Sequence, residues 1–122
     1  FNEVLLRESD IVTFHTYDPP EDVRTLVTFL RRYDRPIVCT EYMARPVSTF
    51  EEILPIFQEE RIGAYSWGLV SGRTQTIYSW LSWVVVDPGP EQAEPWFHDV
   101  LHDDGTPYDE AEAALIRART GG

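Results

Sequence analysis

The amino-acid sequence predicts an α/β fold in which parallel strands alternate with helices. Three runs of strand-like composition occur at residues 11–17, 37–39 and 62–70. The two segments between them repeat apolar residues at helical spacing, and the links from helix to strand are short. Strands and helices that alternate in this way form a parallel sheet with right-handed crossovers.

Composition limits the classes of protein to which the chain can belong. Its 122 residues, 43% of them hydrophobic, are enough for one globular domain, 1–122, with a modest core. A formal charge of −11 argues against nucleic acid or an anionic membrane as a partner. No apolar run reaches the length of a membrane span and no signal peptide is visible, so the compartment stays unassigned. The single cysteine, Cys39, excludes an internal disulfide.

The first strand and helix are predicted from alternation and capping residues. His15 and Tyr17 lie two positions apart, so their side chains are expected on one face of the strand. Asp18 is expected to cap a helix that begins at Pro19, with Glu21 completing a capping box. One apolar stripe then follows at helical spacing: Val23, Leu26, Val27, Leu30 and Tyr33.

The second strand carries the most informative residue. A short apolar run, typical of a buried parallel strand, ends abruptly at Glu41 and Tyr42. Ser48 or Thr49 is expected to cap the next helix, in which Pro55 should cause a bend. The buried face of this helix is predicted to contain Phe50, Ile53, Leu54 and Phe57.

The last third of the chain is predicted less completely. Trp67 lies near the end of the third strand, and a long loop rich in Trp, Pro and Gly follows over residues 71–94. Within that loop, Trp80 and Trp83 are interpreted either as sugar-stacking platforms or as anchors that pin the loop. Residues 96–101 are expected to form a short helix and residues 109–119 an amphipathic one. Residues 1–9 have the pattern of the tail of an earlier helix, which indicates that an N-terminal portion is missing.

Candidate chemistry centres on Glu41. A carboxylate at the end of a buried strand is placed to act as a nucleophile or general base, with His15, Tyr17 and Tyr42 as candidate hydrogen-bond donors. The alternative is a structural ion pair with a nearby arginine, Arg45 or Arg73.

A second candidate is a metal site at His98 and His102, which lie four residues apart and would share one face of a helix. No third ligand is evident in the sequence. We therefore expect no metal, and no cofactor.

Three motifs and the tail of the chain resemble the C-terminal part of a retaining (β/α)₈-barrel glycoside hydrolase, most like glycoside hydrolase family 5 and its cellulase-like relatives. DIVTFHTYD resembles the sixth barrel strand, PIVCTEY the seventh and GAYSWGLV the eighth, while EPWFHDVLHDDGTPYDEAEAALIRA is similar to the closing segment. The resemblance implies that the chain is about strands six to eight of the barrel. A complete barrel needs about 250 residues, so three strands cannot close one.

The resemblance also implies roles for individual residues. Glu41 would be the nucleophile that cleaves β-linked glycans by double displacement, and His15, Tyr17, Tyr42 and Trp67 would contact the substrate. Retaining enzymes need a second carboxyl group about 5–5.5 Å from the first. In the family this second carboxyl group belongs to an Asn-Glu pair on the fourth strand. The Asn-Glu pair at residues 2–3 of this chain cannot be that pair, because too few residues separate it from the first strand to contain a fifth strand and helix.

The isolated chain is therefore expected to lack turnover and to need a partner, either the missing N-terminal barrel portion or a second copy. That partner should cover apolar strand residues left open by a three-strand slice, namely Val12, Phe14, Ile37 and Val38. A non-catalytic carbohydrate-binding or interaction module remains the alternative.

Overall fold

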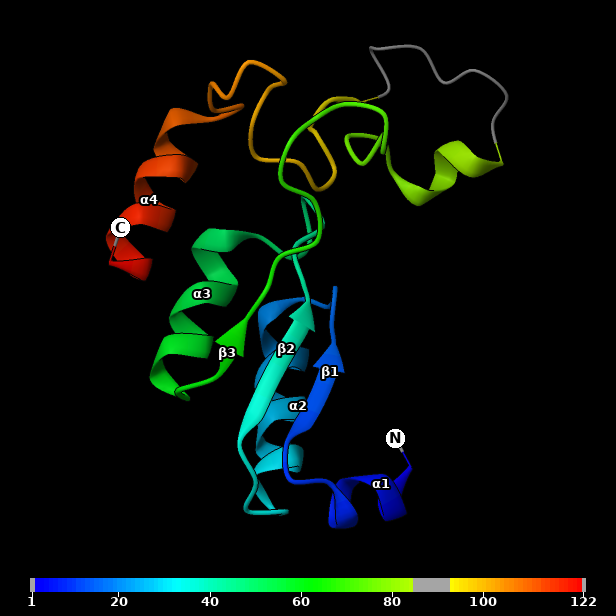
Figure 1. The fold of residues 1–122 in the computed structure, drawn as a ribbon, viewed down its shortest axis with the longest axis vertical. Coiled ribbons are helices and arrows are strands. Elements are labelled where there is room, and N and C mark those ends of the chain that lie inside the picture. The colour runs from blue at the N-terminus through cyan, green and yellow to red at the C-terminus, as the bar shows by residue number, and fades with distance from the viewer. Residues whose placement is uncertain (1, 85–92, 122) are drawn as a thin grey trace.

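The computed structural model of the chain describes residues 2–84 and 93–121 and has an α/β architecture (Figure 1). Strands and helices alternate through its first half, as predicted. Two long loop segments, residues 65–79 and 93–109, lie beyond the C-terminal ends of the strands (Figure 1). The elements in chain order are α1 (Glu3–Glu8), β1 (Val12–His15), α2 (Pro20–Arg31), β2 (Ile37–Glu41), α3 (Phe50–Glu59), β3 (Gly63–Ala64), the 3₁₀ helix η1 (Trp80–Trp83) and α4 (Glu110–Thr120).

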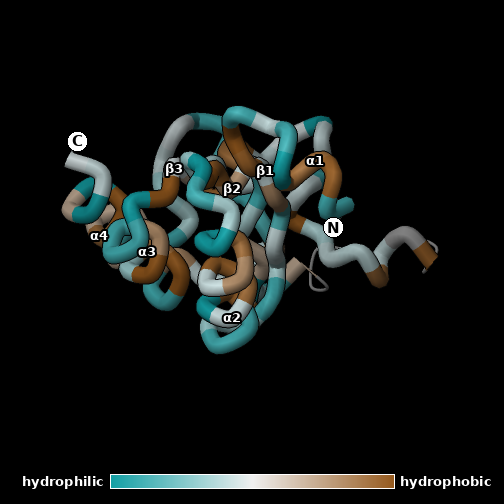
Figure 2. The backbone as a smooth tube through the Cα atoms, turned by 90° about the horizontal axis from the view of Figure 1, so that it is seen from below, coloured by the Kyte–Doolittle hydropathy of each residue, from teal (hydrophilic) through white to brown (hydrophobic). Residues whose placement is uncertain are grey.

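The three strands form one parallel sheet in the order β1-β2-β3, with β2 in the centre. Val12 pairs with Ile37, and Val38 pairs with Gly63. Helices α2 and α3 lie on the same side of this sheet (Figure 2). The predicted parallel α/β fold is therefore confirmed for this small sheet.

The third strand is shorter than predicted, because residues 65–70 leave the sheet. Tyr65 and Trp67 still donate backbone hydrogen bonds to Cys39 and Tyr42, 2.9 Å each. Beyond them the chain turns toward the C-terminal segment, where the carbonyl of Leu69 accepts hydrogen bonds from residues 100 and 101. The end of the predicted strand, residues 69–70, is thus paired with a distant segment instead of with β2.

The core lies between the sheet and the two helices. The predicted stripe of α2 is confirmed, since Val23, Val27 and Leu30 are buried and the other two members pack against the core. The predicted face of α3 is buried as well, together with Ile56.

The same core corrects one expectation about the strands. Val12, Phe14 and Ile37 are 2%, 3% and 4% exposed. Their side chains belong to the buried cluster that the chain's own helices cover, so they need no second polypeptide. The opposite face of the sheet stays open, with Thr13, His15 and Gly63 exposed and Val38 intermediate.

Helix starts follow local chemistry only in part. The expected capping box at α2 is wrong: the helix begins at Pro20, and the Asp18 carboxylate accepts a hydrogen bond from the Thr16 hydroxyl at 2.9 Å. At α3, Thr49 is the N-cap, but its hydroxyl donates to the Glu52 side chain at 3.2 Å. Helix α4 begins one residue later than predicted, and residue 109 is its N-cap: the Asp109 carboxylate accepts the backbone N–H groups of residues 111 and 112.

The expected helix at residues 96–101 is also wrong. This segment is irregular and makes isolated bridges, Val70 with Leu101 and Leu101 with Pro107, and its backbone groups pair with residues 69, 76 and 77. The backbone of residues 96–101 therefore forms hydrogen bonds with the chain that follows β3 instead of the bonds of a helix. Within the part of the chain that the structure describes, no helix is both long and apolar enough to cross a bilayer.

Candidate functional site

A bulge at the end of β2 turns Glu41 to the open face of the sheet. Phe14 pairs with Cys39, and the next pair is His15 with Glu41, so β2 carries one extra residue, Thr40. Cys39 is fully buried in the core, and strict alternation would send the side chain two positions later the same way. An extra residue reverses the alternation beyond it. Glu41 therefore lies on the exposed side of the sheet, opposite His15.

The Glu41 carboxylate is held at one oxygen and open at the other. The Tyr17 hydroxyl donates to Oε2 at 2.8 Å, and Nδ1 of His15 lies 3.2 Å from the same atom. Among the described residues, Oε1 has no hydrogen-bond partner. The Glu41 side chain is 25% exposed and that of His15 53%. A carboxylate fixed in this way keeps one oxygen free to attack an electrophile or accept a proton.

The structural ion pair considered for Glu41 does not form. Arg45 pairs with Glu112 of α4 instead, and within residues 2–84 and 93–121 no ion pair joins Glu41 to Arg73. Among those residues, the basic side chain that lies beside Glu41 is the exposed imidazole of His15. The first alternative raised by the sequence is thereby removed.

Tyr17 acts as a neutral donor. Burial, followed by its hydrogen bond to Glu41, raises the pKa of the Tyr17 hydroxyl well above its ordinary value. The hydroxyl is therefore protonated throughout the physiological pH range, and its proton is directed at Glu41. The Glu41 carboxylate is thus oriented by a neutral hydrogen-bond donor.

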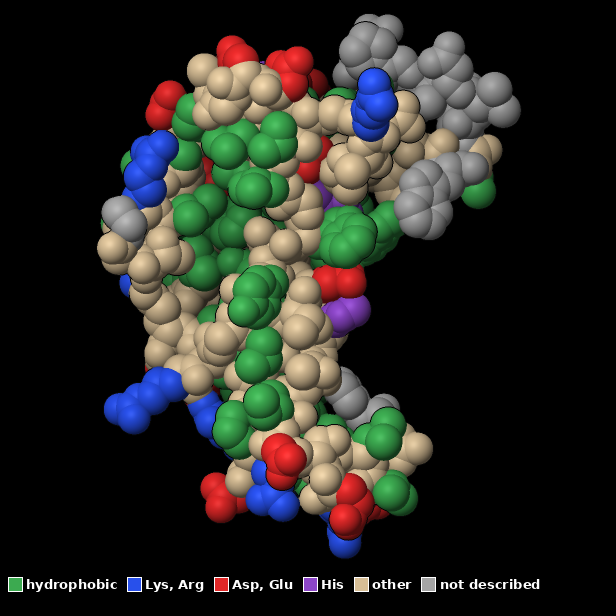
Figure 3. Space-filling view, in the orientation of Figure 1, with side chains coloured by type: hydrophobic (Ala, Val, Ile, Leu, Met, Phe, Trp, Pro, Cys, Tyr) green, Lys and Arg blue, Asp and Glu red, His purple; other side chains and the backbone are tan. Residues whose placement is uncertain are grey.

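Beyond the strand ends, the Tyr17 ring belongs to a cluster of ring side chains. We call this cluster the aromatic wall; its members are Tyr17, Trp80, Phe97 and His98. The Trp80 ring lies edge-on to Tyr17 at 5.0 Å between centroids and to Phe97 at 4.8 Å. His98 contacts Tyr17 and Trp80 at 5.6 and 5.7 Å. At the upper end of β1, exposed hydrophobic, acidic and histidine side chains lie next to one another (Figure 3).

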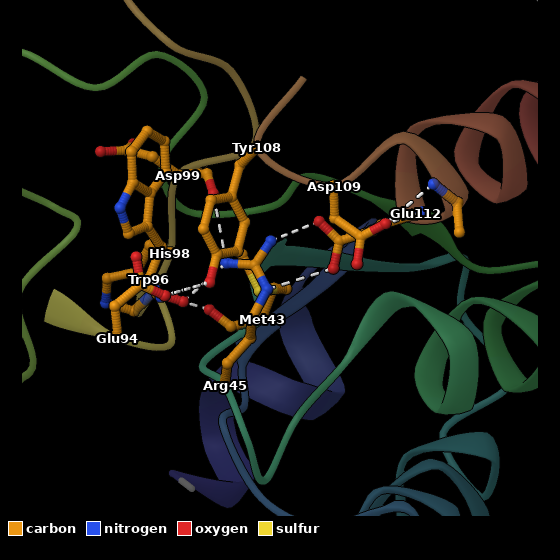
Figure 4. Close-up of polar contacts among 10 residues, drawn as sticks. Met43, Arg45, Glu94, Trp96, His98, Asp99, Tyr108, Asp109 and Glu112 are labelled. Atoms are coloured by element: carbon orange, nitrogen blue, oxygen red, sulfur yellow. Dashed lines mark hydrogen bonds and ion pairs between the residues drawn. The ribbon is translucent and has the colours of Figure 1, made fainter.

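His98 is a buried member of this wall and lies in an irregular segment, not in the short helix predicted for residues 96–101. Its ring is 2% exposed, and Nδ1 lies 2.6 Å from the carbonyl oxygen of Met43 (Figure 4). A carbonyl only accepts, so Nδ1 carries the proton of the neutral ring. Burial lowers the pKa of His98, which keeps it neutral near pH 7. Its predicted partner in a metal pair, His102, instead packs against Trp96 at 4.6 Å.

Arg45 fixes the segment that carries His98, and sequence reasoning missed this role. Its guanidinium donates to the carbonyls of Trp96 and Asp99, at 2.8 and 3.2 Å, and forms a two-pronged pair with Glu112 (Figure 4). The arginine is 7% exposed. An arginine four residues beyond a buried strand was visible in the sequence, but its partners lie more than 50 positions away.

The remaining predicted site residues are placed differently from one another. The Tyr42 ring is 3% exposed and packs edge-on against Phe50 and Phe57, on the core side of the sheet. Trp67 is 45% exposed and its backbone lies beside Tyr42, yet among the described residues no aromatic ring packs on it. The structure thus brings His15, Tyr17 and Glu41 together, and Tyr42 into the core. The Trp83 side chain lies outside the described part of the structure.

Gly68 marks the close approach of two segments behind the site. Its φ is 81°, and a Cβ placed there would lie 2.7 Å from Cβ of His98 and 2.9 Å from Oδ1 of Asp99. Glycine is required here both by the backbone angle and by the space. The contact seats the 93–101 segment directly against the chain that leaves β3.

No protein-family model, no curated protein and no solved structure matches this chain. Within residues 2–84 and 93–121, no three His, Cys, Asp or Glu side chains are grouped so as to hold a metal ion. The function of the site is therefore argued from its own geometry.

Proposed function

We propose that this chain is the part of a retaining β-glycoside hydrolase that supplies the nucleophile, Glu41, and corresponds to about strands six to eight of a (β/α)₈ barrel. One observation carries the proposal. Glu41 lies at the C-terminal end of the central parallel strand with Oε2 held by Tyr17 and His15 and Oε1 open. Catalytic groups of (β/α)₈ barrels occupy this end of the strands.

The chemistry assigned to Glu41 is the first half of a double displacement. Its free oxygen forms a bond to the anomeric carbon of a β-linked sugar while the bond to the leaving oxygen breaks. The leaving oxygen takes the electron pair, and a proton from a general acid. In the second half, the general acid, now acting as a base, takes a proton from a water molecule. The water oxygen bonds to the anomeric carbon while the bond from that carbon to Glu41 breaks, which releases the carboxylate. Tyr17 and His15 hold the attacking carboxylate in place through both steps.

The general acid comes from polypeptide outside this chain. The Asn-Glu pair near the N-terminus forms the N-cap and first residue of α1, which lies beside the start of β1 and at the opposite end of the sheet from Glu41 (Figure 1). Glu3 is also ion-paired with Arg7 at 2.6 Å. The missing barrel portion, or a second copy of the chain, would bring the second carboxyl group to the open face of the sheet.

The sheet has room for such a partner. In the described residues β1 and β3 each pair on one side only, which leaves two free edges. The face away from α2 and α3 carries exposed residues, and unpaired edges favour pairing with further strands.

A mechanism-based label tests the assignment without the missing acid. In 2,4-dinitrophenyl 2-deoxy-2-fluoro-β-glycosides the leaving dinitrophenolate needs no proton, so a nucleophile alone can form the glycosyl ester. The chain is incubated with the glucose-, mannose- and galactose-configured compounds and digested for mass spectrometry. We expect an adduct on the peptide that contains Glu41, and none in Glu41→Gln. An adduct that persists in Glu41→Gln, or no adduct with any of the three sugars, refutes the proposal.

A second candidate function is a carbohydrate-binding module without catalysis. The half-exposed rings of Trp67 and Trp80 favour it, since exposed indoles stack on sugars. Binding of an oligosaccharide that is unchanged by Glu41→Gln, in a chain that the fluoro-sugars do not label, would support this alternative.

A further inference from the structure

Trp80 packs directly against Tyr17, the residue whose hydroxyl holds Glu41. The Tyr17 hydroxyl contacts the Glu41 carboxylate at 2.8 Å, and the ring of the same tyrosine meets Trp80 at 5.0 Å. A sugar placed for attack by Glu41 would therefore be bounded by the aromatic wall. Trp80 belongs to the loop that follows β3, so no strand-end pattern in the sequence points to it.

Trp80 is packed and exposed at the same time. It contacts three rings of the wall, Tyr17, Phe97 and His98, yet 45% of its surface remains open. An indole that served only to anchor the loop would gain most by complete burial, at about 25 cal/mol for each Å² removed from water. The structure instead holds its buried part and presents the rest to solvent, as a stacking platform requires.

The loop under Trp80 is fixed before any ligand binds. The backbone N–H groups of Phe97 and His98 donate to the carbonyls of Ile77 and Thr76 at 2.8 and 3.1 Å. The Thr76 hydroxyl also donates to the Asp99 carboxylate at 2.8 Å. Arg45 ties the same 96–99 segment to the end of β2. A platform held in this way loses little conformational entropy when it binds, which favours affinity.

From this geometry we infer that Trp80 is a specificity-determining residue of the Glu41 site, and that its exposed surface stacks on a sugar ring of the β-glycan. The inference rests on the proposed function and assigns the subsite to Trp80, in the loop after β3. Trp67 is exposed to the same extent but has no ring contact with the wall among the described residues. A sugar on Trp80 would also lie beside the Tyr17 side chain, which links the two contacts to the reacting centre.

The test measures how fast fluoro-sugars label Glu41 as their concentration is varied, which separates the binding constant Ki from the rate constant of the chemical step. Two probes are used, the 2,4-dinitrophenyl 2-deoxy-2-fluoro-β-glycoside of the sugar that labels the wild-type chain and its β-1,4-linked disaccharide. We expect Trp80→Ala to raise Ki about tenfold, equivalent to ~1.4 kcal/mol, with little change in the chemical step. Trp80→Phe, which keeps a stacking ring, should restore most of the affinity.

The matched control is Leu81→Ala, the next residue in η1, whose side chain is 74% exposed. Its Ki should equal that of the wild type. A higher Ki for both probes in Trp80→Ala places the indole on the reacting sugar, and a higher Ki for the disaccharide alone places it on the adjoining sugar. Both outcomes support the inference. Urea midpoints and near-ultraviolet circular dichroism verify that each variant is folded.

Two outcomes overturn the inference while leaving Glu41 as the nucleophile. One is an unchanged Ki in folded Trp80→Ala, above all if Trp67→Ala raises it. The other is a slower chemical step with an unchanged Ki, which would mean that Trp80 only supports Tyr17. If the wild-type chain itself is not labelled, both the assignment of Glu41 as the nucleophile and the assignment of the subsite to Trp80 are refuted.

Discussion

The buried ion pair between Arg45 and Glu112 is predicted to be the largest single polar contribution to stability in the described structure. The two side chains are 8% and 14% exposed. The arginine also satisfies the carbonyls of Trp96 and Asp99. Replacing Arg45 with methionine keeps the aliphatic volume but leaves a carboxylate and two carbonyl groups without their donor.

The expected cost follows from those lost contacts. Removing one partner of a buried pair costs about 3–5 kcal/mol, against a total stability of roughly 5–15 kcal/mol for a domain. Arg45→Met should therefore lower the free energy of unfolding by about 3–5 kcal/mol. Glu112→Gln, which keeps an acceptor for one arm of the guanidinium, should cost less. The double variant Arg45→Met/Glu112→Leu should recover part of the loss, because it leaves no unpaired charge.

Urea unfolding followed by tryptophan fluorescence and by far-ultraviolet circular dichroism measures these differences. The control is Arg24→Met, which breaks the pair with Glu59, of the same type but with side chains 53% and 63% exposed. Surface pairs contribute about 0–1 kcal/mol, so the control should be nearly neutral. If Arg45→Met costs no more than Arg24→Met, the reasoning about the buried pair is wrong.

Two further outcomes follow from the contacts behind the site. Gly68→Ala should destabilise the chain by about 1–3 kcal/mol through the positive φ alone, and the clash with His98 adds to this; an unchanged urea midpoint would contradict that close approach. Burial lowers the pKa of His98 below its ordinary 6.5, so as the pH falls the unfolded chain binds a proton at this residue before the folded chain does. The contribution of His98 to the free energy of unfolding is therefore complete above pH 6.5 and decreases as the pH is lowered through that value. His98→Asn should have a flatter fall in stability between pH 7 and pH 5 than the wild type, and equal slopes would contradict a buried neutral ring.

The sequence by itself determined the elements that depend on local periodicity. The apolar stripe of α2, the buried face of α3 and the existence of helix α4 are each set by residues within a few positions of one another. Alternating strands and helices further required a parallel sheet. The pairing of Glu41 with Tyr17 and His15 was expected because parallel strands end at the same edge of a sheet.

What the tertiary structure decided depends on contacts between distant residues. The extra residue at Thr40 sends Glu41 outward and Tyr42 into the core, and only the pairing of β1 with β2 reveals it. His98 and Trp80 lie beside Tyr17 because segments that follow β3, more than 60 positions further along the chain, fold back over the strand ends. The partner of Arg45 lies in the last helix. Periodicity and capping act over one or two turns of chain, whereas these contacts are selected by burial, hydrogen bonding and charge pairing in three dimensions.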